Sequence, residues 1–168
     1  MERAIADHED FSVDRIEIDR PGPSYLVDTL AAIRERKATK HPPVFIVGQD
    51  AFAEMGEWRE PERLFALADF AVMTRPPGEL LRLSDRMPRV ARDAFELDED
   101  GCIAYHREAD TRIELVRITA LDVSSSRIRQ MLREGRSIRF LVPEGIRESI
   151  EESGCYASPA IASTGTLE

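Results

Sequence analysis

The sequence has little cysteine, no long apolar run and no excess of positive charge. Its two cysteines, Cys102 and Cys155, lie far apart and form no C-x-x-C pair, which argues against a disulfide scaffold and a zinc site. No stretch approaches the roughly 18 consecutive apolar residues of a membrane-spanning helix, and the first residues carry no apolar signal segment. We therefore expect a reduced, cytoplasmic protein with no membrane partner.

Charge and length limit the class of protein further. The 168-residue chain has 23 Lys and Arg against 32 Asp and Glu, a formal net charge of −9. Because binding to a phosphate backbone needs positive charge, no nucleic-acid partner is expected. The length is typical of one domain with its own core. We assign residues 1–156 to a single domain and the small, polar residues 157–168 to a disordered tail.

Short apolar strands alternate with helical patterns along the chain. Two apolar runs, 44–47 and 70–74, predict strands buried on both faces, and 113–118 predicts a third strand. Residues 11–19 alternate apolar and polar side chains with one slip, which favours a further extended strand. Residues 79–101 show no clear pattern.

The helices are marked by apolar periodicity and by capping residues such as Ser24 and Ser124. They are expected at 24–37, from 51 to 55, from Pro61, at 124–134 and at 143–153. The opening residues 2–8 are typical of the end of a helix without a cap. Strands that alternate with helices indicate an α/β fold with a mainly parallel sheet.

In such folds, ligands bind outside the carboxyl ends of the strands. Each polar group there, taken alone, is typical of a capped helix or an ordinary loop. Because parallel strands bring their carboxyl ends to one edge, we expect Asp50, Arg75 and Ser125 to face a common pocket. The polar groups that follow the three strands are Gly48 with Asp50, Thr74 with Arg75, and Asp122 with Ser124, Ser125 and Ser126.

The helix expected at 124–134 carries a local sign of a phosphate ligand. If Ser124 or Ser125 caps it, Arg127 and Arg129 lie in its first two turns, where the helix dipole disfavours cations by roughly 0.3–1 kcal/mol. An anion held by serine hydroxyls, free N–H groups and a guanidinium would remove this mismatch. The alternative is that both arginines pair with carboxylates or point into water, and the pattern does not decide between the two.

Aromatic residues give a weaker signal. Trp58 is the only tryptophan, and a lone tryptophan is more often part of the core. Its polar neighbours Glu57 and Arg59 instead suit a partly exposed indole that stacks on a heteroaromatic ring. Tyr25, at the start of an expected helix, is a second candidate. The histidines lie singly and without metal-ligand spacing, so no protein-held metal is expected; they are His8, His41 and His106.

Four segments taken together are specific. They are 22–30 (GPSYLVDTL), 45–50 (FIVGQD) with Trp58, 74–76 (TRP) and 122–129 (DVSSSRIR). In this order they resemble the G-x-S-Y-T-x-D-T-L, I-x-G-x-D…W, R-P-G and I-S-S-T-x-I-R stretches of bacterial nicotinate-nucleotide adenylyltransferases, a family of the nucleotidyltransferase superfamily. Residues 135–156 are similar to the C-terminal helices of that family, so the resemblance covers nearly the whole chain.

The resemblance implies a Rossmann-like nucleotidyltransferase fold and an enzyme of NAD biosynthesis. The implied reaction transfers the adenylyl group of ATP to nicotinate mononucleotide and gives deamido-NAD and pyrophosphate. Mg²⁺ would be held mainly by the ATP phosphates. The mononucleotide phosphate is an ionised nucleophile, so in-line positioning and neutralisation of phosphate charge would supply the catalysis.

The resemblance also implies roles for individual residues. The residues beside the mononucleotide would be Ser24, Tyr25 and Asp28, with Trp58 stacked on the pyridine ring. The residues that line the nucleotide crevice or bind ATP would be Gly48, Asp50, Arg75, Ser124, Ser125 and Arg129. Of these, Arg129 is the catalytic candidate, because it would neutralise charge on the reacting phosphates.

Two departures from the family stand out. Leu26 replaces the usual threonine, and no G-x-F-D-P-x-H-x-G-H segment occurs in the sequence. On this basis we expect an N-terminally incomplete fold with an exposed apolar sheet edge or face, marginal stability and negligible turnover. Alternatives are a non-catalytic remnant or interaction domain that keeps part of the nucleotide crevice, or a sibling phosphopantetheine adenylyltransferase. A homo-oligomer and the preference for the acid or amide mononucleotide stay open.

Overall fold

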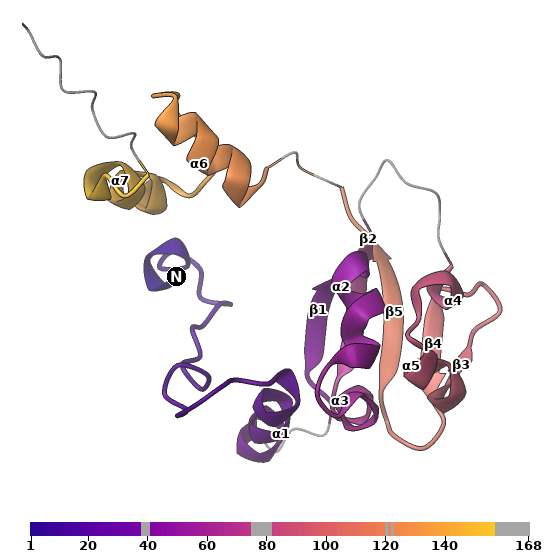
Figure 1. Cartoon of the computed structure of the whole chain (residues 1–168). Coiled ribbons are helices and arrows are strands. Elements are labelled where there is room, and N and C mark those ends of the chain that lie inside the picture. The colour runs from indigo at the N-terminus through magenta and orange to yellow at the C-terminus, as the bar shows by residue number, and fades with distance from the viewer. Residues whose placement is uncertain (38–40, 75–81, 120, 122, 157–168) are drawn as a thin grey trace, which may run out of the picture. The chain divides into compact units, whose positions relative to one another are not determined.

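The computed structural model describes residues 1–37, 41–74, 82–119, 121 and 123–156 (Figure 1). Arg75, Asp122 and the expected tail 157–168 lie outside the described residues. The chain divides into two compact units. The larger unit is Arg15–Ala120, and the smaller unit combines Met1–Asp14 with Leu121–Glu168.

The larger unit is built on a five-stranded sheet with the strand order β1-β2-β5-β4-β3. The strands are β1 (Val44–Gly48), β2 (Asp69–Thr74), β3 (Phe95–Leu97), β4 (Ile103–His106) and β5 (Arg112–Arg117). β2 pairs in parallel with β1 and with β5, whereas β4 is antiparallel to β5 and to β3. Only β4 among the described strands therefore runs against the others, and the expected α/β fold with a mainly parallel sheet is confirmed.

Helices cover one face of this sheet, and α2 and α3 lie over it in Figure 1. The helical segments of the larger unit are α1 (Leu26–Lys37), α2 (Gln49–Glu54), η2 (Met55–Glu57), α3 (Pro61–Leu67), α4 (Leu83–Arg86) and α5 (Arg89–Ala94). The core beneath them centres on Phe65, whose ring lies 5.1 Å from that of Phe70, 6.0 Å from that of Phe95 and 6.2 Å from that of Phe52. Each such buried side chain stabilises the fold by about 1.5–3 kcal/mol.

The other face of the sheet is open at β1. Val44 is 59% exposed and Ile46 63% exposed, while Val47 is buried between helix and sheet. The expectation that 44–47 is buried on both faces is therefore wrong. Burial on both faces needs a covering layer on each side of the sheet, and among the described residues nothing covers Val44 and Ile46. The expected exposed apolar edge or face is therefore confirmed as an exposed face at β1.

The strand expected at 11–19 is absent. The N–H of Asp19 donates to the carbonyl of Arg15 at 2.9 Å, and the two side chains form an ion pair at 3.3 Å, so this part forms a helical turn. Phe11 and Ile18 are 64% and 71% exposed. The slip in the alternation puts the apolar side chains of this segment on different faces, so a strand here would not have one apolar face. A strand also needs a neighbouring strand to pair with, whereas a turn is closed by contacts within the segment.

Residues 79–101 contain three elements that the sequence does not reveal: α4, α5 and β3. None of them is longer than six residues, too short for a periodic pattern to develop. The acidic stretch 96–100 begins inside β3, which contains Glu96. The following turn is closed by Asp98, whose Oδ1 accepts from the N–H groups of Cys102 and Ile103 at 2.9 and 3.0 Å.

The smaller unit contains η1 (Glu2–Ala4), α6 (Ser125–Arg133) and α7 (Glu144–Ser153). Both expected helices are confirmed. The Oγ of Ser124 accepts from the N–H of Arg127 at 3.2 Å and so caps α6. α7 follows Pro143 and ends at Gly154, whose φ of 60° is left-handed. The opening residues form only a short 3-10 helix, which the Nη1 of Arg3 ties to the Oγ of Ser149 at 2.6 Å.

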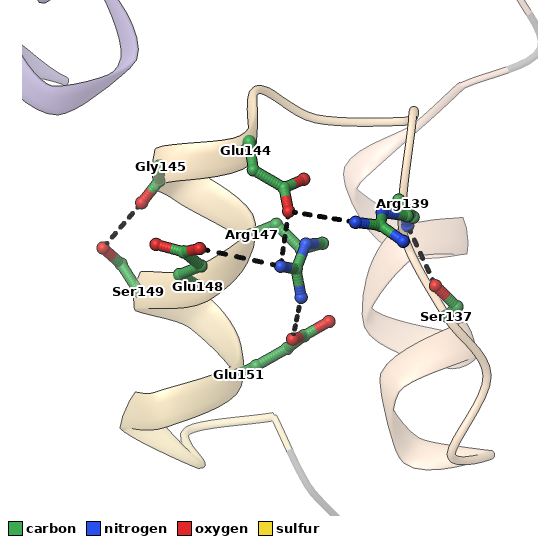
Figure 2. A network of polar contacts seen from close by, with 8 residues as sticks. All are labelled: Ser137, Arg139, Glu144, Gly145, Arg147, Glu148, Ser149 and Glu151. Atoms are coloured by element: carbon green, nitrogen blue, oxygen red, sulfur yellow. Dashed lines mark hydrogen bonds and ion pairs between the residues drawn. The ribbon is translucent and has the colours of Figure 1, made fainter.

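Charged contacts organise α7 and the loop before it (Figure 2). Arg147 pairs with Glu144 and Glu151 on its own helix, and it lies 3.8 Å from a carboxylate oxygen of Glu148. Arg139 in the loop reaches Glu144 at 3.7 Å. The hydrogen bond from Arg147 holds the pKa of the Glu144 carboxyl below its usual value. Ion pairs are thus prominent around α7, whereas the larger unit has an extended apolar core.

Candidate functional site

A cavity of about 580 Å³ opens in the larger unit between the start of α1 and the segment after η2. Three aromatic side chains line it, those of Tyr25, Phe45 and Trp58. Its charged lining residues are Glu17, Glu57 and Arg59. The size lies within the 300–1,000 Å³ typical of small-molecule sites, and an apolar body with a few polar groups is their usual make-up.

The segment before α1 is shaped by a turn and by side-chain hydrogen bonds. Gly22 has a φ of 84°, a left-handed conformation that favours glycine. The Oγ of Ser24 donates to the carbonyl of Glu17 at 3.1 Å, and the Oγ1 of Thr29 donates to the Glu17 carboxylate at 2.8 Å. α1 begins at Leu26, so the expected N-cap role of Ser24 is wrong. Ser24 instead fixes the loop that forms one wall of the cavity.

The opposite wall comes from the end of η2. The N–H of Trp58 donates to the carbonyl of Met55 at 3.2 Å, which holds the indole half-buried against the core and beside the cavity. The guanidinium of Arg59 lies over the ring of Tyr25, 4.5 Å from its centroid. A cation over an aromatic face is attracted by the ring quadrupole. Two segments far apart in the sequence therefore meet at one site.

Several groups near the guanidinium of Arg59 affect its pKa. Partial desolvation acts to lower the pKa of Arg59, but the hydrogen bond with Tyr25 and the negative charge of Asp28 outweigh it and raise this pKa. An ion pair of 3.5 Å joins its Nε to the Oε1 of Glu60, with both side chains half-exposed. Asp28 lies in the first turn of α1 and affects Arg59 electrostatically, but it does not line the cavity.

The structure brings together three of the expected site residues, Ser24, Tyr25 and Trp58. Gly48 ends β1 and the exposed Asp50 lies in the first turn of α2, and neither lines this cavity. The common pocket of Asp50, Arg75 and Ser125 stays a prediction, since Arg75 lies outside the described residues and Ser125 belongs to the smaller unit.

Neither the backbone conformation nor the described neighbours require a glycine at position 48. Its φ is −74°, which any residue adopts, and a Cβ added there would meet nothing within 4 Å. Space is therefore left at the carboxyl end of β1, where the resemblance places the nucleotide crevice. A glycine at such a position allows a ligand to approach the backbone closely.

The start of α6 presents exposed hydroxyl groups and a guanidinium. Ser124, Ser125 and Ser126 are all exposed, and no acidic residue lies in the first turn. The Nη2 of Arg129 donates to the Oγ of Ser126 at 3.3 Å. Arg129 thus lies along the first turn, where the free N–H groups of a helix also collect. These groups are the donors that bind phosphate in other proteins.

Sequence reasoning missed some of the lining residues. Glu17 belongs to no motif, and Phe45 begins the segment 45–50 but has no predicted site role. Arg59 and Glu57 stand out in the sequence only as polar neighbours of Trp58. Only folding places Arg59 against Tyr25. No group of three or more His, Cys, Asp or Glu side chains is arranged to hold a metal ion within the described residues. In the same part of the chain, no helix has the length and apolar character to cross a membrane.

A similar fold occurs in a solved structure, the Plasmodium falciparum nicotinic acid mononucleotide adenylyltransferase complexed with APC. Its TM-score against this chain is 0.51, with 20% sequence identity. The match covers 87% of this chain and 64% of that one, so this chain spans less than two thirds of its length. At this identity the likeness shows the fold alone, a Rossmann-like nucleotidyltransferase fold.

Sequence relatives are more similar. No family model matches the chain. Proteins described as "Probable nicotinate-nucleotide adenylyltransferase" match nearly all of it. The one from Trichlorobacter lovleyi is 37% identical over 156 residues, covering 93% of this chain and 72% of the relative. The Methylococcus capsulatus protein is 37% identical, covering 94% and 73%, and that of Syntrophotalea carbinolica is 38% identical, covering 92% and 70%. The chain therefore belongs to the nicotinate-nucleotide adenylyltransferase family.

Proposed function

We propose that the chain binds nicotinate mononucleotide and ATP and serves adenylyl transfer between them, giving deamido-NAD and pyrophosphate. The observation that carries this proposal is the cavity of the larger unit. It is lined by Ser24, Tyr25 and Trp58, which belong to two separate family motifs. Folding thus brings together three of the four residues that the resemblance assigns to the mononucleotide, and Asp28 is the exception. The cytoplasmic location and a homo-oligomeric state stay predictions.

The mononucleotide occupies this cavity with its pyridine ring against Trp58. The indole is half-buried, packs against the core and lines the cavity, and an indole in such a place can stack on a heteroaromatic ring. Leu26 lines the cavity where the family has threonine, and its side chain offers no hydroxyl. Leu26 is the first residue of α1, however, and N–H groups in the first turn of a helix have no partner within the helix. The backbone there can still donate to the substrate.

ATP uses other groups of the chain. Gly48, Asp50 and Arg75 line the nucleotide crevice in this proposal, supported by the space left at Gly48. Ser124, Ser125 and Arg129 bind the phosphates, supported by the donors at the start of α6. Gly48, Asp50 and Arg75 belong to the larger unit, and Ser124, Ser125 and Arg129 belong to the smaller unit.

The chain needs no nucleophilic side chain for this reaction. An oxygen of the mononucleotide phosphate attacks the α-phosphorus of ATP, and the bond from this phosphorus to the pyrophosphate oxygen breaks. Arg129 and the N–H groups of α6 are the donors that we propose for the ATP phosphate oxygens. Magnesium, when bound, would supply further charge neutralisation, and in this proposal the ATP phosphates hold most of it.

Trp58 provides a direct binding test, because it is the only tryptophan. Titration with nicotinate mononucleotide should quench its fluorescence with saturation, whereas ribose 5-phosphate, which lacks the ring, should not. Calorimetry on Trp58→Phe serves as the matched control and should show weaker binding. A chain that shows neither quenching nor heat with the mononucleotide would contradict the proposal.

A non-catalytic nucleotide-binding protein is the second candidate. It is favoured by one observation: none of the three histidines stands in an H-x-G-H context. Loss of a single donor to the developing charge costs about 10²–10³ in rate, so we expect turnover of the printed chain to be low. An assay of pyrophosphate release from ATP and the mononucleotide distinguishes the enzyme from the non-catalytic protein. It is run on this chain and on a version preceded by the H-x-G-H segment of a relative. Binding without pyrophosphate release in either protein would support the second candidate.

A further inference from the structure

Thr29 is one of two polar residues that are buried in the described part of the chain, at 7% exposed, and the other is Thr111. Thr29 lies near the start of α1, within the segment 22–30, and the resemblance to the family assigns it no role. A buried hydroxyl costs free energy unless it is hydrogen-bonded. The partners of Thr29 therefore show what this side chain contributes.

The hydroxyl of Thr29 joins two charged side chains from the segment that precedes α1. Its Oγ1 donates to the Oε1 of Glu17 at 2.8 Å and accepts from the Nη1 of Arg20 at 3.2 Å. A hydroxyl suits this place because it can donate one hydrogen bond and accept another, which neither a methyl group nor an ionised carboxylate can do. Hydrogen bonds to charged groups are also the stronger ones. Thr29 therefore anchors the preceding segment to α1 at two points.

These contacts close the loop 17–24, which leads into one wall of the cavity. The Oγ of Ser24 donates to the carbonyl of Glu17 at 3.1 Å, so the two ends of the loop are tied together. At the next residue, the carbonyl of Tyr25 accepts from the N–H of Thr29 at 3.2 Å. Glu17, Ser24 and Tyr25 line the cavity. Thr29 thus contacts two of the lining residues without lining the cavity itself.

We propose that Thr29 is a positioning residue for the mononucleotide, because its hydroxyl holds the loop 17–24 in the conformation that forms one wall of the cavity. This rests on the proposed function of the cavity. Thr29 itself does not touch the ligand and takes no part in the transfer step. Its contribution is preorganisation, since a ligand binds more weakly when only a fraction of the protein has the binding-competent conformation.

NMR relaxation of the ligand-free, 168-residue chain tests the positioning itself. Thr29→Val keeps the shape of the side chain and removes the hydroxyl, and Thr111→Val is the matched control. Thr111 also loses a buried hydrogen bond, since its Oγ1 donates to the carbonyl of Phe65 at 2.9 Å, away from the cavity. The order parameters of the amides in 17–25 should fall from about 0.85, typical of rigid backbone, to below about 0.6 in Thr29→Val alone. Equal order parameters in Thr29→Val and the wild type would overturn the inference.

Calorimetry with nicotinate mononucleotide measures the effect on binding. In Thr29→Val the Kd should rise about 10-fold, as expected when the competent fraction falls to roughly one tenth. Thr29→Ser keeps the hydroxyl, and its Kd should stay within about 3-fold of the wild-type value. Thr111→Val should also keep the wild-type Kd, although both valine variants should lower the thermal unfolding midpoint. A loss of stability alone therefore does not produce the expected pattern.

A second variant removes the other partner of the hydroxyl. Arg20→Met keeps the apolar stem of the side chain and removes the donor to Thr29. Arg20 is partly buried and does not line the cavity. Loop order and mononucleotide affinity should both fall, by less than in Thr29→Val, because the contact between Thr29 and Glu17 remains. If Thr29→Val does not fold, Arg20→Met decides, and unchanged order parameters and Kd in this variant would overturn the inference.

The outcomes separate this inference from the proposed function. A wild-type chain that does not bind the mononucleotide overturns the proposed function, and the positioning role with it. A wild-type chain that binds it, with an unchanged Kd in Thr29→Val, overturns the inference alone. An equal rise of the Kd in Thr29→Val and Thr111→Val also overturns the inference, because it shows that general loosening of the fold weakens binding.

Discussion

The two units of the chain are stabilised by different interactions. The larger unit has a continuous apolar core with Phe65 at its centre. In the described part of the smaller unit, only Met131 and Ile138 are buried, and ion pairs around Arg147 hold α7. The comparison teaches that the proposed mononucleotide cavity rests on packing, whereas the candidate phosphate site lies in a unit with few buried apolar side chains and several ion pairs. Salt and acid should therefore affect the two proposed binding activities differently.

The largest effect is expected from Phe65→Ala in the larger unit. Phe65 is 1% exposed and its ring packs against three other phenylalanines. We expect the free energy of unfolding to fall by about 3–5 kcal/mol, the usual cost of removing a buried aromatic ring. Trp58 fluorescence during urea denaturation measures it. Ile138→Ala in the smaller unit should shift this transition much less, and Phe140→Ala, at a side chain 93% exposed, should leave it unchanged. An equal shift of the urea transition in all three variants would contradict the proposed difference between the two units.

The next effect concerns phosphate binding by the smaller unit. Arg129→Ala removes the guanidinium that lies along the first turn of α6. ATP binding should weaken by about 1.5–3 kcal/mol, typical of a hydrogen bond to a charged group, while binding of the mononucleotide should persist. Arg133→Ala, in the last turn of the same helix, is the matched control. Calorimetry with ATP measures the affinity of both variants. Equal losses of ATP affinity in Arg129→Ala and Arg133→Ala would show that only the net charge of the helix matters.

A smaller effect is expected from Gly48→Ala in the larger unit. The added Cβ meets no atom within 4 Å and the φ is ordinary, so stability should not fall and should rise by up to about 1 kcal/mol. ATP binding should weaken several-fold if a ligand approaches this backbone. Thermal denaturation and calorimetry on the same sample give both values. Unchanged ATP binding would remove Gly48 from the nucleotide crevice.

The smallest effect is the acid response of the smaller unit. The pKa of Glu144 is lowered in the folded state by its hydrogen bond with Arg147. The stability this provides is complete above the unfolded pKa of about 4.3 and is lost as the pH falls through the lower folded value. The helical circular dichroism should therefore become less resistant to urea below about pH 5. Glu144→Gln should flatten this dependence, whereas Glu99→Gln in the larger unit should not. If Glu144→Gln keeps the same pH dependence of urea resistance, other carboxylates cause it and the prediction is wrong.

Sequence and structure agree best where contacts are local. Ser124 at the start of α6 and Gly154 at the end of α7 act within a few residues of themselves, and both were predicted. Ser24 is the counterexample, because its hydroxyl donates to Glu17 rather than to its own helix. Which of several reachable partners a hydroxyl takes depends on how the preceding loop folds back, which no local pattern encodes.

The sequence by itself determined the alternation of strands and helices, the parallel core of β1, β2 and β5, and the family motifs. These follow from apolar periodicity, capping residues and fixed spacing, all of which act along the chain. Only the tertiary structure decided that β1 is open on one face, that 11–19 forms no strand, and that Arg59 lies over Tyr25. Such features depend on which segments meet after folding. The guanidinium of Arg59, for example, lies over Tyr25, a residue that is distant in the sequence.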